Sequence, residues 1–380
     1  MMKKSLLFIL IASCLNVHSQ QLESTKVKKD DSRIINTKIM KFKDSLNTWF
    51  SRNEIIGGEM LIIKDKKTIL HEVVGWKDLE DKETYLKNTI CRIRSMTKPF
   101  LTMSILQLVD QKKMSLDDKV AKHVLSFNNE KSKLITIRNL LTHTSGIENA
   151  DYANYVGHIT NYKSLKNYVD IIGETGPIYK PNSQFKYSDL NSSVLAHLIT
   201  IISGIKVEDY IKTNIIKPLE MSNTFSSIGI NNPKRKEFSS TYVLNSNSFV
   251  KYWDNLDEEQ YSFFRGSGGL YSTPIDYAKF VSLWLDYGIS DDKTYISKKL
   301  VKETFTPSKF FKDYGLHWSL YNYENTDTSK NLPVFHHGGS DGTFAIAIPN
   351  KNIIAIYFTQ SRGSIVLRKF VRMILKEFAS

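Results

Sequence analysis

The stretch Arg94 to Phe100 (RSMTKPF) carries the pattern S-x-x-K directly before an apolar segment with helical spacing. Residues three apart share one face of a helical turn, so we expect the Lys98 amine to reach the Ser95 hydroxyl. Pro99 suits a first helical turn, although a residue that precedes proline, here Lys98, disfavours helical dihedral angles. The context thus indicates Ser95 as a nucleophile; the alternative is a helix N-cap serine. The same spacing recurs without that context at Ser183, Ser203, Ser248 and Ser290.

The apolar periodicity on both sides of this stretch predicts hairpins near the two ends of the chain and helices between them. Apolar runs flank the polar residues 64–67 and again 349–352, which is typical of β-hairpins. We expect an α+β fold in which both hairpins share one antiparallel sheet flanked by helices, with a mostly helical subdomain inserted at about 106–262. The expected hairpins are 58–74 and 343–359, and the expected helices are 39–50, 100–108, 190–202 (closed by Gly204) and 365–378.

The N-terminus has the features of an export signal. Lys3 and Lys4 precede an apolar segment, 5–13, that is too short to span a bilayer. An ordinary cleavage site after residue 19 competes with a lipoprotein signal, 1–13, that would leave Cys14 as a lipid anchor. Both alternatives predict an exported protein, either periplasmic or membrane-anchored. The polar residues 20–37 are then a linker, and 38–380 form the folded domain.

Composition narrows the functional classes. The formal net charge is +13, and 41% of the residues are hydrophobic, which is ordinary for a globular protein. Two cysteines, Cys14 and Cys91, exclude a disulfide framework and a cysteine-based zinc site. The lysines are scattered without an arginine-rich arm, so we do not expect nucleic-acid binding. The charge is either a solvated surface or an attraction to anionic cell-envelope polymers.

Two further motifs are weak. Gly338 to Gly342 (GGSDG) matches the nucleophile elbow G-x-S-x-G, but that fold needs its histidine after the serine, and the last histidine is His337. The segment from Thr343 also indicates a strand rather than a helix, so a glycine-rich turn is expected. Side chains of the adjacent His336 and His337 would point to opposite faces of a strand, so no metal site is predicted.

The segment Phe185 to Asp189 (FKYSD) precedes the helix expected at 190–202. Taken by itself, it suits Asp189 as a helix N-cap and Tyr187 as a core aromatic.

Taken together, these segments resemble the serine β-lactamase and penicillin-binding-protein superfamily, and most of all its class C-like serine hydrolase branch of esterases, D-aminopeptidases and related enzymes. The resemblance runs from about Gly57 to Thr359 and implies a β-lactamase/transpeptidase-like fold. It rests on seven blocks in the family's order: RSMTKPF from Arg94, SLDD from Ser115, ITIRNLLTHTSGI from Ile135, FKYSDL from Phe185, IKPLEM from Ile216, GGLYST from Gly268 and HHGG from His336.

The resemblance also implies a role for each matching residue. The family's nucleophile falls on Ser95, its paired lysine on Lys98, and the tyrosine of Y-x-N on Tyr187. The K-T-G motif, often H-x-G in esterases and peptidases, falls on His336, His337 and Gly338. The oxyanion hole would be the backbone N–H groups of Ser95 and Gly339.

Two departures from the family pattern bear on substrates. Asp189 replaces the asparagine of Y-x-N; its carboxylate would still hold Lys98 but would repel acidic groups nearby. His336 and His337 replace the lysine and threonine that help to hold a substrate carboxylate in the family. Both changes indicate weak or absent β-lactamase activity.

The resemblance and the residue chemistry together predict an acyl-enzyme mechanism. A serine hydroxyl is a weak nucleophile without an adjacent base, a role expected of Lys98 with Tyr187, and no metal or organic cofactor is required. Because histidine titrates near pH 6.5, activity is expected to change between about pH 5.5 and 7.5 through His336. The predicted function is an exported serine hydrolase acting on ester or D-amino-acid peptide-like amide substrates, small molecules or peptides. The alternative is a non-catalytic envelope protein that binds peptidoglycan fragments or partners.

Overall fold

The structure, a computed structural model, describes residues 36–148, 158–227, 231–257, 261–321, 323–328 and 330–379. The predicted export signal, Cys14 and most of the predicted linker lie outside these ranges. Residues 36–51 are helical, a few residues longer than the helix expected at 39–50. The chain divides into a unit that ends at Thr48 and a unit from Trp49 to Ser380, and all that follows concerns the second unit.

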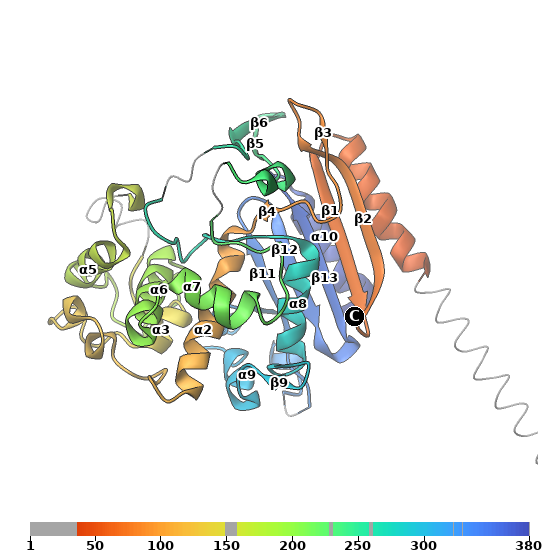
Figure 1. The fold of residues 1–380 in the computed structure, drawn as a ribbon. Coiled ribbons are helices and arrows are strands. Elements are labelled where there is room, and N and C mark those ends of the chain that lie inside the picture. The colour runs from red at the N-terminus through yellow and green to blue at the C-terminus, as the bar shows by residue number, and fades with distance from the viewer. Residues whose placement is uncertain are drawn as a thin grey trace, which may run out of the picture. The chain divides into compact units, whose positions relative to one another are not determined.

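A seven-stranded antiparallel sheet contains both predicted hairpins (Figure 1). The first turns at Asp65 and Lys66, whose positive φ angles of 51° and 62° match the twist of a two-residue hairpin loop. The second turns at Pro349–Lys351, and its last strand pairs with β1, so the predicted joining of the two hairpins in one sheet is confirmed. In spatial order the strands are β10 (Ser319–Tyr321), β11 (Val334–Gly339), β12 (Thr343–Ile348), β13 (Ile353–Thr359), β1 (Gly57–Lys64), β2 (Lys67–Asp78) and β3 (Glu83–Thr84).

Each face of this sheet is covered by a helix, and strand alternation assigns the residues to the faces. Phe358 of β13 packs against Tyr277 of α8 (Pro274–Leu285), with ring centroids 6.2 Å apart. Its neighbour Tyr357 packs on the opposite face against Phe370 of α10 (Val366–Ile374), at 5.3 Å. Since successive side chains in a strand point to opposite faces, β12 and β13, which are buried along their whole length, are covered on both sides.

The remaining helices form a layer on the α8 side of the sheet (Figure 1). The predicted helices 100–108 and 190–202 are present and pack against each other, and the second ends at Gly204 in the left-handed conformation, with φ of 78°. The layer comprises α2 (Lys98–Asp110), α3 (Ile137–Leu141), α5 (Leu165–Thr175), α6 (Asp189–Ser203), α7 (Val207–Ile211) and α9 (Lys298–Thr304).

Within the described ranges, no single helix is long and apolar enough to cross a membrane; α6 and the segment 207–216 pass that test only as a pair bent by 76°.

Short strands frame the region around Ser95. β5 (Thr241–Asn245) and β6 (Ser248–Trp253) form a hairpin inside the segment 106–262 that was predicted as mostly helical. β14 (Ser361–Arg362) pairs with β5 and completes a three-stranded sheet. β4 (Cys91–Arg92) pairs with β7 (Tyr271–Ser272), and β8 (Ile289–Ser290) pairs with β9 (Lys293–Thr294). The β4–β7 pair fixes the chain immediately before Ser95.

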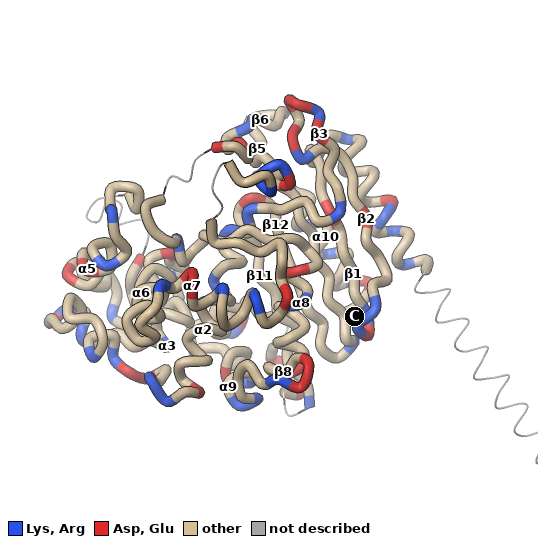
Figure 2. Tube along the Cα trace, in the orientation of Figure 1, with Lys and Arg blue, Asp and Glu red and all other residues tan. Residues whose placement is uncertain are grey.

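Basic and acidic residues are interspersed along the described chain rather than gathered on one element (Figure 2).

Candidate active site

Ser95 lies on a 3-10 turn, Arg94–Thr97, that leads directly into α2 at Lys98. Lys98 adopts helical dihedral angles (φ −59°, ψ −41°) even though proline follows it. Tertiary hydrogen bonds hold the turn: Ile93 N–H donates to the Leu270 carbonyl at 3.1 Å, and the Tyr277 hydroxyl donates to the Met96 carbonyl at 3.2 Å. These contacts outweigh the local preference of a residue before proline.

Lys98 is fully buried and its ammonium group has three oxygen partners. It donates to Ser95 Oγ at 3.1 Å, to Asp189 Oδ1 at 2.7 Å and to the Ser267 carbonyl at 3.5 Å. An ammonium group has three hydrogens, so all three are used. The predicted pairing of Ser95 with Lys98 is therefore present, with Asp189 as the charge partner.

Asp189 is the first residue of α6, but its side chain points to Lys98 instead of capping the helix. Burial alone would raise the pKa of this carboxyl, yet the Lys98 ammonium and the Arg265 guanidinium, 3.6 Å from Oδ2, together hold the pKa below its usual range. The carboxylate is thus shared between two cations. The expected repulsion of acidic groups by Asp189 is offset by these neighbours.

Tyr187 lies beside the same ammonium. Lys98 Nζ is 4.6 Å from the centroid of the Tyr187 ring, within cation–π range. The ring also packs on His143, with centroids 4.4 Å apart, and the side chain borders a cleft with 38% of the residue exposed. Tyr187 is therefore not a core aromatic, which is the role that the segment Phe185 to Asp189 suggests when it is taken by itself.

The two adjacent histidines occupy opposite faces of β11, as predicted, but the face next to Lys98 belongs to His337. His336 packs on Phe344, whose ring contacts Phe370 of α10 on the far face. His337 points toward Trp318 and lies close enough to Lys98 for the positive charge to depress the histidine's pKa. The placement of His336 at the site was wrong by one residue, because the motif H-H-G-G fits H-x-G in two frames and only the strand pleat distinguishes them.

Neither histidine titrates near neutral pH. Burial lowers the pKa of His336 to about 4, and burial together with the Lys98 charge lowers the pKa of His337 to about 3. The expected activity change between about pH 5.5 and 7.5 therefore has no basis in these side chains.

Two more buried histidines, His143 and His317, lie in the same cluster. Their ring centroids are 5.0 Å apart. Both residues adopt positive φ angles, 52° and 55°, which residues other than glycine rarely take. Burial holds both pKa values well below the ordinary one, and the Lys98 charge lowers them further. The site thus surrounds one cation with neutral imidazoles.

The ring nitrogens of this cluster have defined partners on one side only. Nδ1 of His317 faces the Lys98 carbonyl at 3.2 Å and Nδ1 of His337 faces the Gly338 carbonyl at 3.0 Å, so each Nδ1 carries the proton. Their Nε2 atoms are then acceptors without a partner among the described residues. Within the described part of the chain, no three His, Cys, Asp or Glu side chains converge so as to hold a metal ion.

An ion pair joins the Ser95 turn to the turn after β11. Arg94 Nε donates to Asp341 Oδ2 at 2.5 Å, and the Tyr252 hydroxyl donates to Asp341 Oδ1 at 2.5 Å. The Asp341 side chain is fully buried, and Arg94 has a positive φ of 48°. We call this group, Arg94 with Asp341 and Tyr252, the clamp. It fixes the spacing between the backbone of Ser95 and that of the β11–β12 turn.

Gly339 lies at that junction. A Cβ atom there would come within 2.4 Å of the Ile93 carbonyl oxygen, so only glycine permits this approach. Gly338 is on the His336 face, beside Phe344. The oxyanion role expected of the Gly339 N–H stays a prediction; the neighbouring Ser340 lines the cleft with Ser95.

A cleft of about 470 Å³ opens over Ser95. Tyr187, Asp189, Ser267 and Ser340 border it, together with several basic and aromatic side chains from outside the predicted motifs. These further residues are Arg92, Arg94, His158, Tyr252, Trp253, Tyr261, Arg265 and Arg362.

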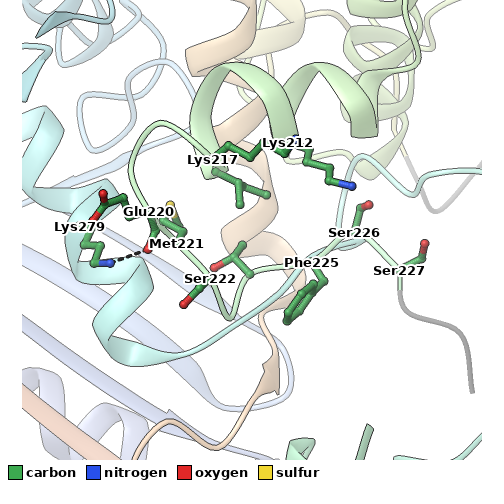
Figure 3. A pocket seen from close by; sticks show the side chains of 11 residues that line it. Lys212, Lys217, Glu220, Met221, Ser222, Phe225, Ser226, Ser227 and Lys279 are labelled. Carbon is green, nitrogen blue, oxygen red and sulfur yellow. Dashed lines mark hydrogen bonds between the residues drawn. The ribbon is translucent and has the colours of Figure 1, made fainter. Parts of the chain in front are cut away.

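A separate hollow of about 710 Å³ contains none of the predicted site residues (Figure 3). Lys212, Lys217 and Ser222 line it, and Lys279 donates to the Glu220 carbonyl at 2.6 Å at its edge. It is more spacious than the cleft over Ser95, but no serine among its described lining residues is hydrogen-bonded to a lysine.

Sequence reasoning missed the clamp, the arginines of the cleft and the inner histidines. His143 lies inside the block ITIRNLLTHTSGI, and Arg94 directly precedes Ser95. Both residues could have been found from motifs that the sequence analysis had already identified. Asp341, Tyr252 and Arg362 carry no local pattern. The contacts Arg94–Asp341, Tyr252–Asp341 and Arg362–Tyr252 each join positions about 90 to 250 residues apart.

Comparisons with known proteins find a matching family model and several relatives. The family model described as Beta-lactamase matches residues 37–379. Penicillin-binding protein 4* of Bacillus subtilis is 27% identical over 303 residues, covering 75% of this chain and 63% of that protein. Protein flp of Staphylococcus aureus is 32% identical over 204 residues, 52% of this chain and 40% of that protein. The chain thus spans less than two thirds of the length of these curated relatives.

A solved structure supports the fold. The octameric penicillin-binding protein homologue from Pyrococcus abyssi superposes with a TM-score of 0.72 at 24% identity, covering 89% of this chain and 77% of that one. Since the family match extends over nearly all the described residues, the chain belongs to the beta-lactamase family, within the serine β-lactamase and penicillin-binding-protein superfamily.

Proposed function

We propose that this protein is an exported serine hydrolase that forms an acyl-enzyme on Ser95 and cleaves ester or D-amino-acid peptide-like amide bonds, with weak or no action on β-lactams. The observation that carries the proposal is the 3.1 Å contact between Lys98 Nζ and Ser95 Oγ at a cleft, in a chain of this family. Small hydrolysable substrates suit a cleft of about 470 Å³.

The proton route follows from the contacts of Lys98. Because its ammonium donates to three oxygens, Lys98 accepts the Ser95 proton only after it has released one of its own, to Asp189 or to solvent. The neutral amine then takes the Ser95 proton as Oγ attacks the carbonyl carbon. Tyr187, at the cleft border, delivers a proton to the leaving group, and water completes hydrolysis of the acyl-enzyme.

The strand wall contributes a neutral environment in place of a second cation. His337 occupies the position next to Lys98, and its depressed pKa keeps it uncharged at neutral pH. A β-lactam carboxylate directed at β11 would therefore find an imidazole instead of an ammonium group, which supports low β-lactamase activity.

The cellular part of the proposal rests on the N-terminal sequence alone. Mass spectrometry of the mature N-terminus distinguishes cleavage after residue 19 from lipid attachment at Cys14. Retention of the basic segment, with neither event, would contradict export by such a signal.

Hydrolysis of a chromogenic short-chain ester tests the chemistry. We expect turnover in the unmodified protein and a loss of about 10³-fold or more in Ser95→Ala, since the nucleophile is then absent. Ser290→Ala, in another S-x-x-K sequence outside the cleft, is the matched control and should keep full activity. Equal rates in Ser95→Ala and the unmodified protein would exclude the proposed nucleophile.

The saturated hydrogen bonding of Lys98 favours one alternative: a non-catalytic envelope protein that uses the cleft to bind peptidoglycan fragments. Asp189 Oδ1 lies 2.7 Å from Lys98 Nζ, and this ion pair occupies the amine that catalysis would use as a base. Absence of turnover and of covalent Ser95 labelling by a coloured cephalosporin or a phosphonate, with retained fragment binding, would establish this alternative.

A further inference from the structure

The cleft over Ser95 is strongly cationic. Four of its described lining residues are arginines, Arg92, Arg94, Arg265 and Arg362, whereas Asp189 is the one acidic side chain among them. Lys98 adds a further positive charge directly beneath Ser95. Low-dielectric walls focus such charge, so the cleft attracts anions.

Three of these arginines already have partners that hold them in place. Arg94 is bound in the clamp by Asp341, Arg265 lies 3.6 Å from Asp189, and the Arg92 guanidinium stacks on Trp253 with its central carbon 4.4 Å from the ring centroid. Carboxylates partly neutralise the charges of Arg94 and Arg265, and the side chains of all three form the walls.

Arg362 differs from the other three. It is the last residue of β14, its side chain is 48% exposed, and its closest acid is Asp341 at 3.9 Å. The two Asp341 oxygens already accept hydrogen bonds of 2.5 Å from Arg94 and Tyr252. The Arg362 guanidinium makes no hydrogen bond to any described residue, and it lies 5.8 Å from the Tyr252 ring centroid at the cleft border. Its donors are available to a ligand.

Resting on the proposed function, we propose that Arg362 is a specificity-determining residue that binds a carboxylate or phosphate group on the substrate of Ser95. A guanidinium presents a planar fork of donors that matches either anion in bidentate geometry. The substrate class is then an ester or amide whose acyl or leaving group carries an oxyanion on the β14 side of the cleft. The β14 side of the cleft carries the Arg362 charge, whereas His337 on β11 supplies none. The substrate anion would therefore lie beside β14 and not beside β11.

Paired chromogenic esters test this in the full-length protein. The acyl groups are butyrate, which is neutral, and succinate, which adds a terminal carboxylate; a phosphate-bearing acyl chain of similar length distinguishes the two oxyanions. We expect kcat/KM to be about tenfold higher for at least one anionic ester than for butyrate. The preference should shrink as salt rises from about 0.05 to 0.5 M, because screening weakens charge attraction.

Variants locate the preference. Arg362→Gln should abolish it while leaving butyrate hydrolysis within about twofold, and Arg362→Lys should retain part of it as a point charge. Arg372→Gln removes the same charge from an exposed position on α10, outside the cleft, and should change nothing. Equal loss on neutral and anionic esters, or an unchanged preference in Arg362→Gln, would overturn the proposal.

Binding measurements separate this inference from the proposed function. Calorimetric titration with glutarate, glycerol phosphate and the neutral glutaramide should show binding of an anion that weakens about tenfold in Arg362→Gln. If no ester is hydrolysed but this difference holds, the proposed chemistry fails and the anion site stands. If esters are hydrolysed but the anions bind no better than glutaramide, the anion site fails and the chemistry stands.

Discussion

The two walls that meet at Ser95 are built from opposite chemistry. The helical wall, from the starts of α2 and α6, holds Lys98 and Asp189 as a hydrogen-bonded ion pair with no donor left over. The strand wall, from β11, holds a neutral histidine whose Nε2 has no partner among the described residues. The helical wall thus holds the charged groups and the proton of Lys98, whereas the strand wall holds an uncharged hydrogen-bond acceptor.

The clamp is what relates these walls. Arg94 comes from the helical side and Asp341 from the strand side, and Tyr252 bonds to both. In the proposed mechanism the oxyanion hole takes one backbone donor from each wall, so its width would depend on this contact. Four experiments test this division between the walls, each aimed at a different part of it.

Removing the cation tests the helical wall. Lys98→Met should lower kcat by about 10³-fold, because Ser95 loses its base, and it should also destabilise the fold by leaving the Asp189 carboxylate without its closest partner. Steady-state kinetics and thermal unfolding measure the two effects. The double variant Lys98→Met/Asp189→Asn should regain stability but not activity. Recovery of activity in the double variant would show that the ion pair, and not the amine, is what Ser95 needs.

Opening the clamp tests the junction. Asp341→Asn keeps the side-chain shape but removes the charge that holds Arg94, and we expect kcat to fall about 10²-fold with KM changed less than about threefold. Tyr252→Phe should produce a smaller fall in the same direction. A rise in KM at constant kcat would instead mean that the clamp only shapes substrate binding.

Acid stability tests the far face of β11. The folded pKa of His336 is about 4, below the ordinary value of about 6.5, so the unfolded chain binds the proton more readily as pH falls through that window. The contribution of neutral His336 to the unfolding free energy is complete above about pH 6.5 and is lost as pH falls toward about 4. At about pH 5 the unfolding free energy is lower by about 2 kcal/mol than at neutral pH for this reason. His336→Gln should make the decline in stability with acid shallower. The exposed His158→Gln is the control, and an equal effect there would remove His336 as the cause.

Comparing the two adjacent histidines tests the strand wall directly. His337→Gln should lower kcat by about tenfold through the loss of the imidazole beside Lys98, whereas His336→Gln should leave kcat within about twofold. Ester hydrolysis at neutral pH measures both. The reverse order would return the catalytic role to His336 and contradict the orientation of β11.

Local patterns were informative where neighbours in sequence are also neighbours in space. The hairpin turning at Asp65 and Lys66, the helix 190–202 with Gly204 and the S-x-x-K spacing all follow from interactions within a few residues. The choice between His336 and His337 did not, because both frames of the motif satisfy the same pattern and only the strand's pairing determines which side chain faces Lys98.

The amino-acid sequence determined the fold class, the two hairpins, and the meeting of Ser95 and Lys98, since periodicity, turn residues and helical spacing act locally. Only the tertiary structure decided which histidine faces the cation, that Arg265 shares the Asp189 charge, and that Arg94, Tyr252 and Asp341 join the two walls. The reason is physical: pKa values and ion pairs depend on burial and on charges a few ångströms away, and the chain brings those groups together from positions up to about 250 residues apart.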